Sequence, residues 1–340
     1  MNVLVTGATG YIARHVICQL LEEGYRVRGT MRSLDKAADL RDDLREVTPL
    51  ADMLECVEAD LTADAGWDAA CEGCDVVFHL ASPFPAHMPK SDDELIRPAV
   101  DGTDRVLSAA KGQNVRRVVM LSSFAAIGYG WGDDLPPLLT EEHWSRPENE
   151  KDNTAYTRSK TLAEKAAWDF IGDPEQAQME LVSINPGLVL GPLIGKTTST
   201  SHQVIIELLS GRMPAYPDLT FAVVDVRDVA RAVLKVAELP VAAGQRFLLA
   251  EGMHHISEIA DILRNSIPDR AKGMPTRQAP NWLVRLIAFF NPNYRQIVIE
   301  LGKRRSCSND KLKSFLGIAP LPLEQTLHET ASDLMRHGCV

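Results

Sequence analysis

A glycine turn between an expected strand and an expected helix constrains the fold of this 340-residue chain more than any other feature. Residues 2–6 form a short apolar run, and residues 7–13 follow as Gly-Ala-Thr-Gly-Tyr-Ile-Ala, leading into a helical period of apolar residues. Gly7 permits a tight turn, Gly10 lets the backbone approach a pyrophosphate, and Ala13 lets the helix pack on the sheet. A plain surface loop is the alternative. The order strand, turn, helix instead favours a dinucleotide site with the helix N-terminus facing the phosphates.

The residues after the second expected strand, 25–31, bear on the choice of dinucleotide. An acidic residue that selects NAD is expected near the end of this strand, and the sequence has none at that place. Arg32, Ser33 and Lys36 stand there instead, and two cations suit a 2′-phosphate better than a bare hydroxyl. Exposed cations ahead of a helix are the alternative interpretation. The sequence therefore predicts NADP(H) as the cofactor.

Further apolar runs alternate with helical patterns along the first half of the chain. They are expected strands at residues 54–59, 76–80, 115–121 and 181–185. This alternation predicts the α/β class with a doubly wound parallel Rossmann sheet, whose ligands lie beyond the carboxyl ends of the strands. We expect an NADP-binding Rossmann domain at 1–185 and a smaller mixed α/β substrate-binding lobe at 186–340, which begins with a rigid turn at 186–189. Residues 219–250 are expected to return to the Rossmann domain.

The composition excludes several classes of protein. With 45% hydrophobic and 24% charged residues, the chain falls in the ordinary soluble globular range. A net charge of -10 in mixed-sign patterns argues against nucleic acid as a partner. No stretch approaches the ~20 apolar residues that span a membrane, and no export signal precedes the first strand, so we expect a cytoplasmic protein. The cysteines are scattered, and Cys71 and Cys74 are interpreted as a helix end and a turn, so no metal site is predicted.

Tyr156 and Lys160 stand four residues apart just inside an expected long helix. Four residues make about one helical turn, so the phenol and the ammonium project from the same face. A nearby cation favours the phenolate, which would let the phenol exchange a proton near neutral pH. A half-buried tyrosine beside a solvated lysine is the structural alternative to this catalytic interpretation.

Polar residues stand at the ends of other expected strands. Ser122 and Ser123 follow the fifth strand, where a hydroxyl could hold a substrate carbonyl oxygen or cap a turn. Asp60, followed by Leu61, ends the third strand and could reach an adenine or cap the next turn. Residues 128–153 interrupt the alternation, and their aromatic side chains could line a substrate pocket or anchor the loop.

Five motifs together carry a resemblance to a known family. They read Gly-Ala-Thr-Gly-Tyr-Ile from residue 7, Leu-Ala-Ser-Pro-Phe from residue 80, Val-Val-Met-Leu-Ser-Ser from residue 118, Tyr-Thr-Arg-Ser-Lys from residue 156 and Asn-Pro-Gly-Leu-Val from residue 185. With these motifs the chain resembles the extended short-chain dehydrogenases/reductases. Within them it is similar to the branch of dihydroflavonol 4-reductase, cinnamoyl-CoA reductase and the aldehyde or methylglyoxal reductases.

The resemblance implies an NADPH-dependent reductase that transfers hydride to an aldehyde or ketone. Tyr156 would protonate the developing alkoxide, Ser123 would assist with Ser122 as the fallback, and Lys160 would hold the nicotinamide ribose and lower the pKa of the tyrosine. The resemblance also implies which residues line the cofactor. They are Gly7, Thr9, Gly10, Tyr11 and Ile12 at the pyrophosphate, Arg32 and Lys36 at the 2′-phosphate, Asp60 and Leu61 at the adenine, and Ala81, Pro186 and Val189 near the nicotinamide, with Ser122 also at the cofactor.

The sequence does not specify which carbonyl compound is the substrate. Phe84, Phe124, Trp131 and Tyr216 predict an apolar, partly aromatic pocket for a small molecule. A monomer or a homodimer is expected. An NAD-dependent nucleotide-sugar epimerase or dehydratase is an alternative, because it shares the tyrosine, lysine and serine, although the two cations after the second strand argue against it. A non-catalytic NADP-binding redox sensor is a second alternative, but a sensor needs no such set of three residues.

Overall fold

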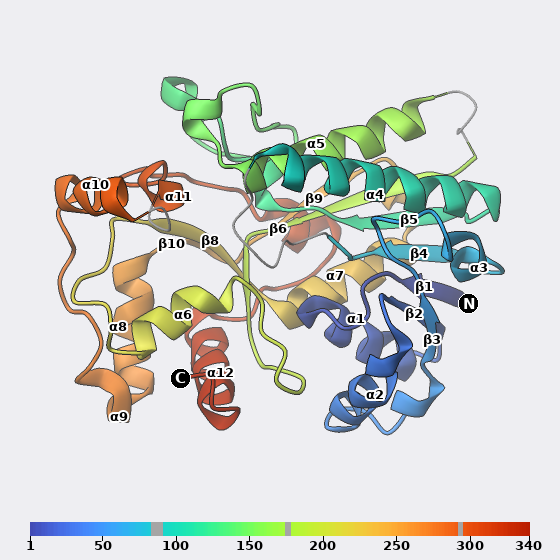
Figure 1. Ribbon diagram of the computed structural model, residues 1–340, viewed down its shortest axis with the longest axis horizontal. Coiled ribbons are helices and arrows are strands. Elements are labelled where there is room, and N and C mark those ends of the chain that lie inside the picture. The colour runs from blue at the N-terminus through green and yellow to red at the C-terminus, as the bar shows by residue number, and fades with distance from the viewer. Residues whose placement is uncertain (83–90, 174–177, 292–294) are drawn as a thin grey trace.

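The computed structural model describes residues 1–82, 91–173, 178–291 and 295–340 (Figure 1). Its centre is a seven-stranded sheet in the order β3-β2-β1-β4-β5-β6-β9, in which every neighbouring pair is parallel. The strands are β1 (Asn2–Val5), β2 (Arg26–Met31), β3 (Glu55–Glu58), β4 (Val76–His79), β5 (Arg117–Leu121), β6 (Glu180–Pro186) and β9 (Arg246–Leu249). The predicted fold class, a doubly wound parallel sheet, is confirmed.

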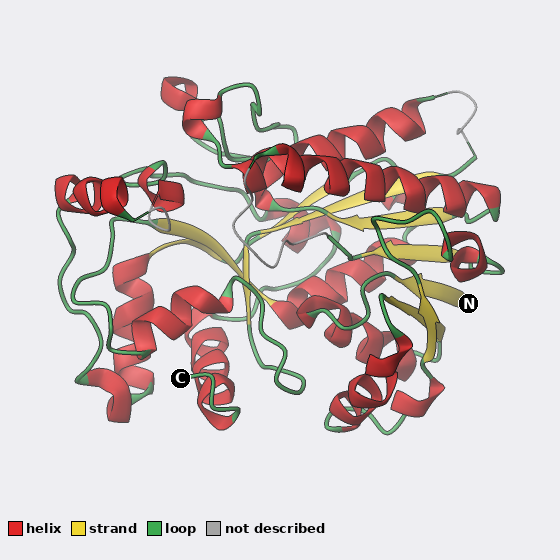
Figure 2. Cartoon of the chain, viewed as in Figure 1, coloured by secondary structure: helices red, strands yellow, loops and turns green. Residues whose placement is uncertain are grey.

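Helices cover both faces of this sheet, so its central strands are buried on both sides (Figure 2). Strand β4, with the sequence Val-Val-Phe-His, is buried at all four residues, as parallel strands between two helical layers require. One layer contains α1 (Tyr11–Glu22), α2 (Ala37–Arg45) and α7 (Val226–Glu238). The other contains α3 (Trp67–Cys71), α4 (Asp93–Gly112) and α5 (Ala155–Gly172).

A reciprocal capping box sets the start of α5. The Thr154 hydroxyl accepts a hydrogen bond from the Thr157 backbone N at 3.2 Å, and the Thr157 hydroxyl accepts one from the Thr154 backbone N at 2.9 Å. This arrangement satisfies two backbone donors that a helix N-terminus otherwise leaves unpaired. The first turn of the helix therefore begins at Ala155, and Tyr156 and Lys160 fall on consecutive turns of one face.

A second lobe contains a smaller sheet in the order β10-β8-β7, where β7 and β8 are parallel and β8 and β10 antiparallel. Its strands and helices are β7 (Leu188–Leu190), α6 (His202–Leu209), β8 (Thr220–Asp225), β10 (Gly252–His255), α8 (Ile256–Ser266), α9 (Pro268–Ala271), α10 (Asn281–Phe290), α11 (Arg295–Val298) and α12 (Leu323–Arg336). None of the helices in the described parts of the chain is long and apolar enough to cross a membrane.

The structure differs from the sequence prediction where the chain leaves the main sheet. Residues 186–189 are predicted to form a rigid turn, whereas Leu188–Leu190 form β7 and pair with β8. Gly187 permits this, because a Cβ atom there would lie 2.3 Å from the Ala222 carbonyl oxygen of β8. Within 219–250, α7 and β9 join the layers of the main sheet, while β8 belongs to the smaller sheet.

Candidate active site

The candidate site lies at the carboxyl ends of β1, β4 and β5. The chain runs outward from β1 through β2 to β3 and then crosses back to β4 on the other side of β1. The connections that follow β1 and β4 therefore leave the sheet in opposite directions. This arrangement opens a crevice beyond the strand ends, where doubly wound sheets bind their ligands. Gly7 follows β1, Ala81 follows β4, and Ser122 and Ser123 follow β5.

The glycine turn is held in a conformation that excludes side chains. Gly7 has φ +67°, and a Cβ atom on it would lie 3.0 Å from the Cβ atom of Ala81. Thr30 anchors the turn, because its hydroxyl accepts from the Gly7 N at 3.0 Å and its carbonyl from the Ala8 N at 2.8 Å. Gly10 then begins α1 with extended backbone and no side-chain cap. The backbone donors of this helix end suit a pyrophosphate.

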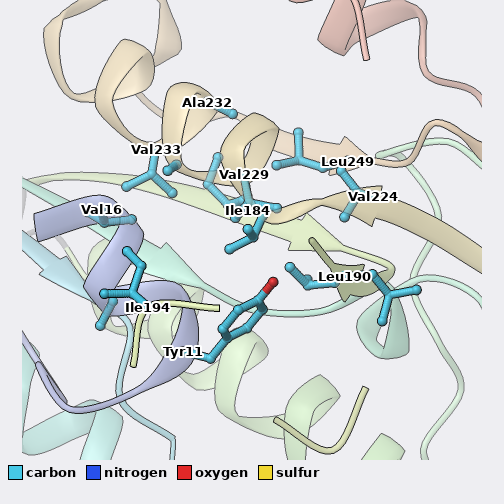
Figure 3. Packing of buried hydrophobic residues seen from close by; sticks show 14 of the residues in the cluster. Tyr11, Val16, Ile184, Leu190, Ile194, Val224, Val229, Ala232, Val233 and Leu249 are labelled. Atoms are coloured by element: carbon cyan, nitrogen blue, oxygen red, sulfur yellow. The ribbon is translucent and has the colours of Figure 1, made fainter. Parts of the chain in front are cut away.

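Tyr11 points away from this turn. Its ring is 4% exposed and packs among Val16, Ile184 and Leu190 in the core between α1 and the sheet (Figure 3). Burial raises the pKa of its phenol well above the usual value. The Tyr11 side chain therefore faces the core, and a contact between Tyr11 and the pyrophosphate stays a prediction for its backbone. Its neighbour Ile12 is half-buried and packs against the same core.

A cavity of about 300 Å³ lies beside the glycine turn. It is lined by Thr9, Met31, Arg32, Ser33 and Lys36. Both cations that predict NADP(H) therefore line one cavity, and a polyanion placed there would meet two positive charges. A larger hollow of about 480 Å³ lies among residues 64–109 and is lined by none of the predicted site residues.

Asp60 adopts the capping role that the sequence left open. Its Oδ1 atom accepts hydrogen bonds from the Thr62 backbone N and the Thr62 hydroxyl, both at 2.8 Å. The backbone hydrogen bond lowers the pKa of Asp60, and the positive charge of Arg32 lowers it further. Arg32 thus lies close to an anion of the protein itself. The adjoining Leu61 packs against Gly102 of α4.

Ser123 and Tyr156 come together at the end of β5. The Ser123 hydroxyl accepts from the Ala125 N at 3.1 Å, which caps a short 3-10 helix, and it lies close enough to the Tyr156 phenol to lower the pKa of that group. The tyrosine is 37% exposed as a whole residue, whereas its hydroxyl end is surrounded by protein. Desolvation of this hydroxyl raises its pKa, and the interaction with Ser123 lowers it. A lowering of this pKa by Lys160 stays a prediction.

Ser122 points to the opposite side of the strand. It is 4% exposed, and its hydroxyl donates to Glu164 Oε2 at 2.6 Å. Successive residues of an extended strand alternate between faces, so only one of the two serines can face Tyr156. The geometry therefore favours Ser123 over Ser122 as the serine of the site.

Lys160 lies one turn after Tyr156 and faces the end of β4. Burial lowers the pKa of this ammonium to about 8, and the negative charge of Glu164 opposes that shift. On β4, burial and the charge of Lys160 together lower the pKa of His79 to about 3, so this histidine is neutral. His79 Nδ1 lies 3.1 Å from the Thr6 hydroxyl, which accepts from the Ala81 N at 2.9 Å.

The sequence matches a family model over residues 3–250, described as the NAD dependent epimerase/dehydratase family. This match covers most of the chain. The protein belongs to the NAD-dependent epimerase/dehydratase family.

Similar curated proteins include several reductases. The chain is 35% identical over 335 residues to cinnamoyl-CoA reductase CAD2 of Medicago truncatula, covering 98% of this chain and 95% of the relative. It is 34% identical over 302 residues to a protein of Candida albicans called a putative NADPH-dependent methylglyoxal reductase, covering 83% of this chain and 88% of the relative. The predicted extended short-chain dehydrogenase/reductase branch is thus confirmed.

Solved structures agree with these relatives. The yeast methylglyoxal/isovaleraldehyde reductase Gre2, complexed with NADPH, superimposes with a TM-score of 0.81 at 29% identity and covers 100% of both chains. That neighbour carries the cofactor that Arg32 and Lys36 predict for this member of the epimerase/dehydratase family.

Of the aromatic residues predicted to line a substrate pocket, Phe124 and Trp131 share one packed cluster and Tyr216 belongs to another. Phe124 is 6% exposed among Ile127 and Leu139, and Tyr216 is 9% exposed in the main core. Trp131 anchors its own loop, since its indole N–H donates to the Ile127 carbonyl at 2.9 Å and the Arg146 guanidinium lies 4.5 Å from the indole ring. Phe84 lies outside the described residues. A pocket lined by all four aromatic residues stays a prediction.

The two residues predicted near the nicotinamide from the Asn-Pro-Gly motif are both buried. Pro186 ends β6, and Val189 lies in β7 with 4% exposure. Sequence reasoning missed three polar residues behind the site, namely Glu164, Asn185 and Arg246. Glu164 offered a signal, because it stands four residues after Lys160 and therefore on the same face of the helix. Arg246 offered none, since its partner is 82 residues away.

Proposed function

We propose that this member of the extended short-chain dehydrogenases/reductases is an NADPH-dependent carbonyl reductase that converts an aldehyde or ketone to an alcohol. The approach of the Ser123 hydroxyl to the Tyr156 phenol carries this proposal. It brings two hydroxyl groups together at the end of β5, beside the strand ends where the family binds its dinucleotide. A third group, Lys160, follows one helical turn later.

Backbone and side-chain groups of the chain would hold the cofactor in two places. The turn at Gly7 and the start of α1 fit the pyrophosphate, because Cβ atoms are absent there and backbone N–H groups are available. Arg32 and Lys36 fit the 2′-phosphate of NADPH from within one cavity. Bound in this way, NADPH would supply the hydride that reduces the carbonyl carbon.

Tyr156 would deliver the proton to the carbonyl oxygen. Its raised pKa keeps the phenol protonated at neutral pH, which is the form that a proton donor needs. Ser123 would hydrogen-bond to the same oxygen and stabilise its developing negative charge. Lys160 would bind ribose hydroxyl groups and add positive charge near the phenol while its ammonium is protonated.

An NADPH-oxidation screen tests the proposal. Purified protein is given NADPH or NADH with aliphatic aldehydes, aryl ketones, 2-oxo esters, sterol ketones and hydroxycinnamoyl thioesters, and loss of the reduced nicotinamide is followed. We expect turnover with at least one carbonyl class, with NADPH preferred. A strong preference for NADH would favour the nucleotide-sugar epimerase alternative, and tight NADPH binding without any turnover would favour the redox sensor.

A further inference from the structure

A buried glutamate lies one helical turn beyond Lys160. The Glu164 side chain is fully buried, and both carboxylate oxygens accept hydrogen bonds. Oε1 accepts from Arg246 Nε at 2.7 Å and from the Trp168 indole at 3.3 Å, while Oε2 accepts from the Ser122 hydroxyl and from Asn185 Nδ2, both at 2.6 Å. All of these partners are donors, which matches an ionised carboxylate.

Arg246 holds this carboxylate from the neighbouring strand β9. Its Nε and one terminal nitrogen both reach Glu164, in a forked arrangement that fixes the carboxylate plane. Its other donors reach the carbonyls of Glu141 at 2.6 Å and His143 at 2.7 Å, and its guanidinium lies 3.7 Å from the centre of the Trp144 ring. The pair therefore ties helix α5 to the sheet and to the loop before the helix.

The Glu164 carboxylate is linked to both groups that flank the proposed proton donor Tyr156, namely Ser123 and Lys160. Asn185 bridges Glu164 and the Ser123 backbone, because its side-chain nitrogen also donates to the Ser123 carbonyl at 3.2 Å. Glu164 also lies four residues after Lys160 on α5, and its charge opposes the loss of the Lys160 proton. Among the described residues, the neutral His79 on β4 also interacts with Lys160, and Tyr156 stands one turn before it on α5.

Resting on the function proposed above, we propose that Glu164, held by Arg246, is a positioning residue for carbonyl reduction. It orients Ser123 through Asn185 and places a negative charge beside Lys160 that keeps the ammonium protonated. A purely structural ion pair would stabilise the fold without influencing how the rate depends on pH. The two roles are carried by different contacts, so different substitutions separate them.

Glu164→Gln removes the charge and keeps the side-chain length. In the folded variant, the alkaline limb of kcat/KM for NADPH is expected to move down by about one pH unit, because an opposite charge near an ionisable group shifts its pKa by roughly that much or more. Asn185→Ala removes the link to Ser123 and leaves the charge of Glu164 in place. It is expected to lower kcat roughly 10-fold with the alkaline limb unchanged.

Glu180→Gln is the matched control. Glu180 pairs with the buried Arg117 at 2.6 Å, at the amino end of β6 and therefore opposite the site. We expect this variant to lose stability but to keep the kcat and the pH profile of the wild type. Thermal unfolding followed by circular dichroism compares the stability of all variants and confirms that each is folded in the assay.

An unchanged alkaline limb in folded Glu164→Gln, or the same shift in the Glu180→Gln control, overturns the inference. Should Glu164→Gln fail to fold, Glu164→Gln combined with Arg246→Met removes both buried charges. It is expected to show a smaller downward shift, because loss of the Arg246 cation acts on the pKa of Lys160 in the opposite direction. A wild-type protein without carbonyl-dependent NADPH oxidation would contradict the proposed function itself. An active wild type with unchanged variants would contradict only the positioning role.

Discussion

Arg32 is expected to decide the preference for NADPH, and Arg32→Ala tests this directly. Arg32 and Lys36 line the cavity beside the glycine turn, and both side chains are exposed to solvent. A hydrogen bond to a charged group contributes about 1.5–3 kcal/mol, and solvent screening at an exposed position reduces that to roughly 1.5 kcal/mol. Because ~1.4 kcal/mol is a factor of ten, the Michaelis constant for NADPH should rise roughly 10-fold.

The neighbouring acid increases the effect for NADPH. Arg32 lies close enough to Asp60 to lower the pKa of that carboxyl group. Once the guanidinium is removed, the negative charge of Asp60 is no longer neutralised and repels the 2′-phosphate of NADPH. NADH has no 2′-phosphate and is not repelled. The Michaelis constant for NADH is therefore expected to change less than about twofold.

Initial rates at varied NADPH and NADH, with one saturating carbonyl substrate, measure the effect. Arg45→Ala is the control, because Arg45 ends α2, pairs with Asp42 and Asp52, and does not line the cavity. Higher salt should weaken NADPH binding to the wild type more than to Arg32→Ala. Equal increases of both Michaelis constants in Arg32→Ala would refute the phosphate site, as would a similar effect of Arg45→Ala.

Three further predictions concern the reaction and the fold. Tyr156→Phe should keep its NADPH affinity within about threefold of the wild-type value, as measured by fluorescence titration. It should lower kcat by ~10²-fold, because only the proton donor is lost. Near-normal turnover would remove Tyr156 from that role. The wild-type kcat/KM for NADPH should fall above pH ~8. Burial lowers the pKa of Lys160 to about 8, so the charge of this ammonium is lost as the pH rises past that value. A pH profile that stays flat to pH ~10 would contradict this expectation. Gly29→Ala should lower the free energy of unfolding by about 1–3 kcal/mol in urea titrations, because the new Cβ atom would lie 2.7 Å from the Cβ atom of Ala8. An unchanged unfolding midpoint would show that the glycine turn can shift at little cost.

Local sequence patterns predicted the elements of the main sheet and the turn between β1 and α1. Strands buried on both faces have continuous apolar runs, and Gly7 occupies a backbone conformation that other residues rarely adopt. The four-residue spacing of Tyr156 and Lys160 likewise follows from helix geometry alone. Each of these features depends on residues that are neighbours along the chain, so the sequence contains the necessary information.

Long-range contacts decided the remaining features. Which serine faces Tyr156 depends on the partner of Ser122, which is Glu164 on a helix 42 residues away. The Tyr11 side chain lies in the core because α1 packs that face against the sheet. The sequence alone determined the order of elements and the chemistry available, since local spacing and backbone freedom set both. The tertiary structure decided which hydroxyl and which carboxylate serve the site, because burial and hydrogen bonding between distant segments direct each side chain.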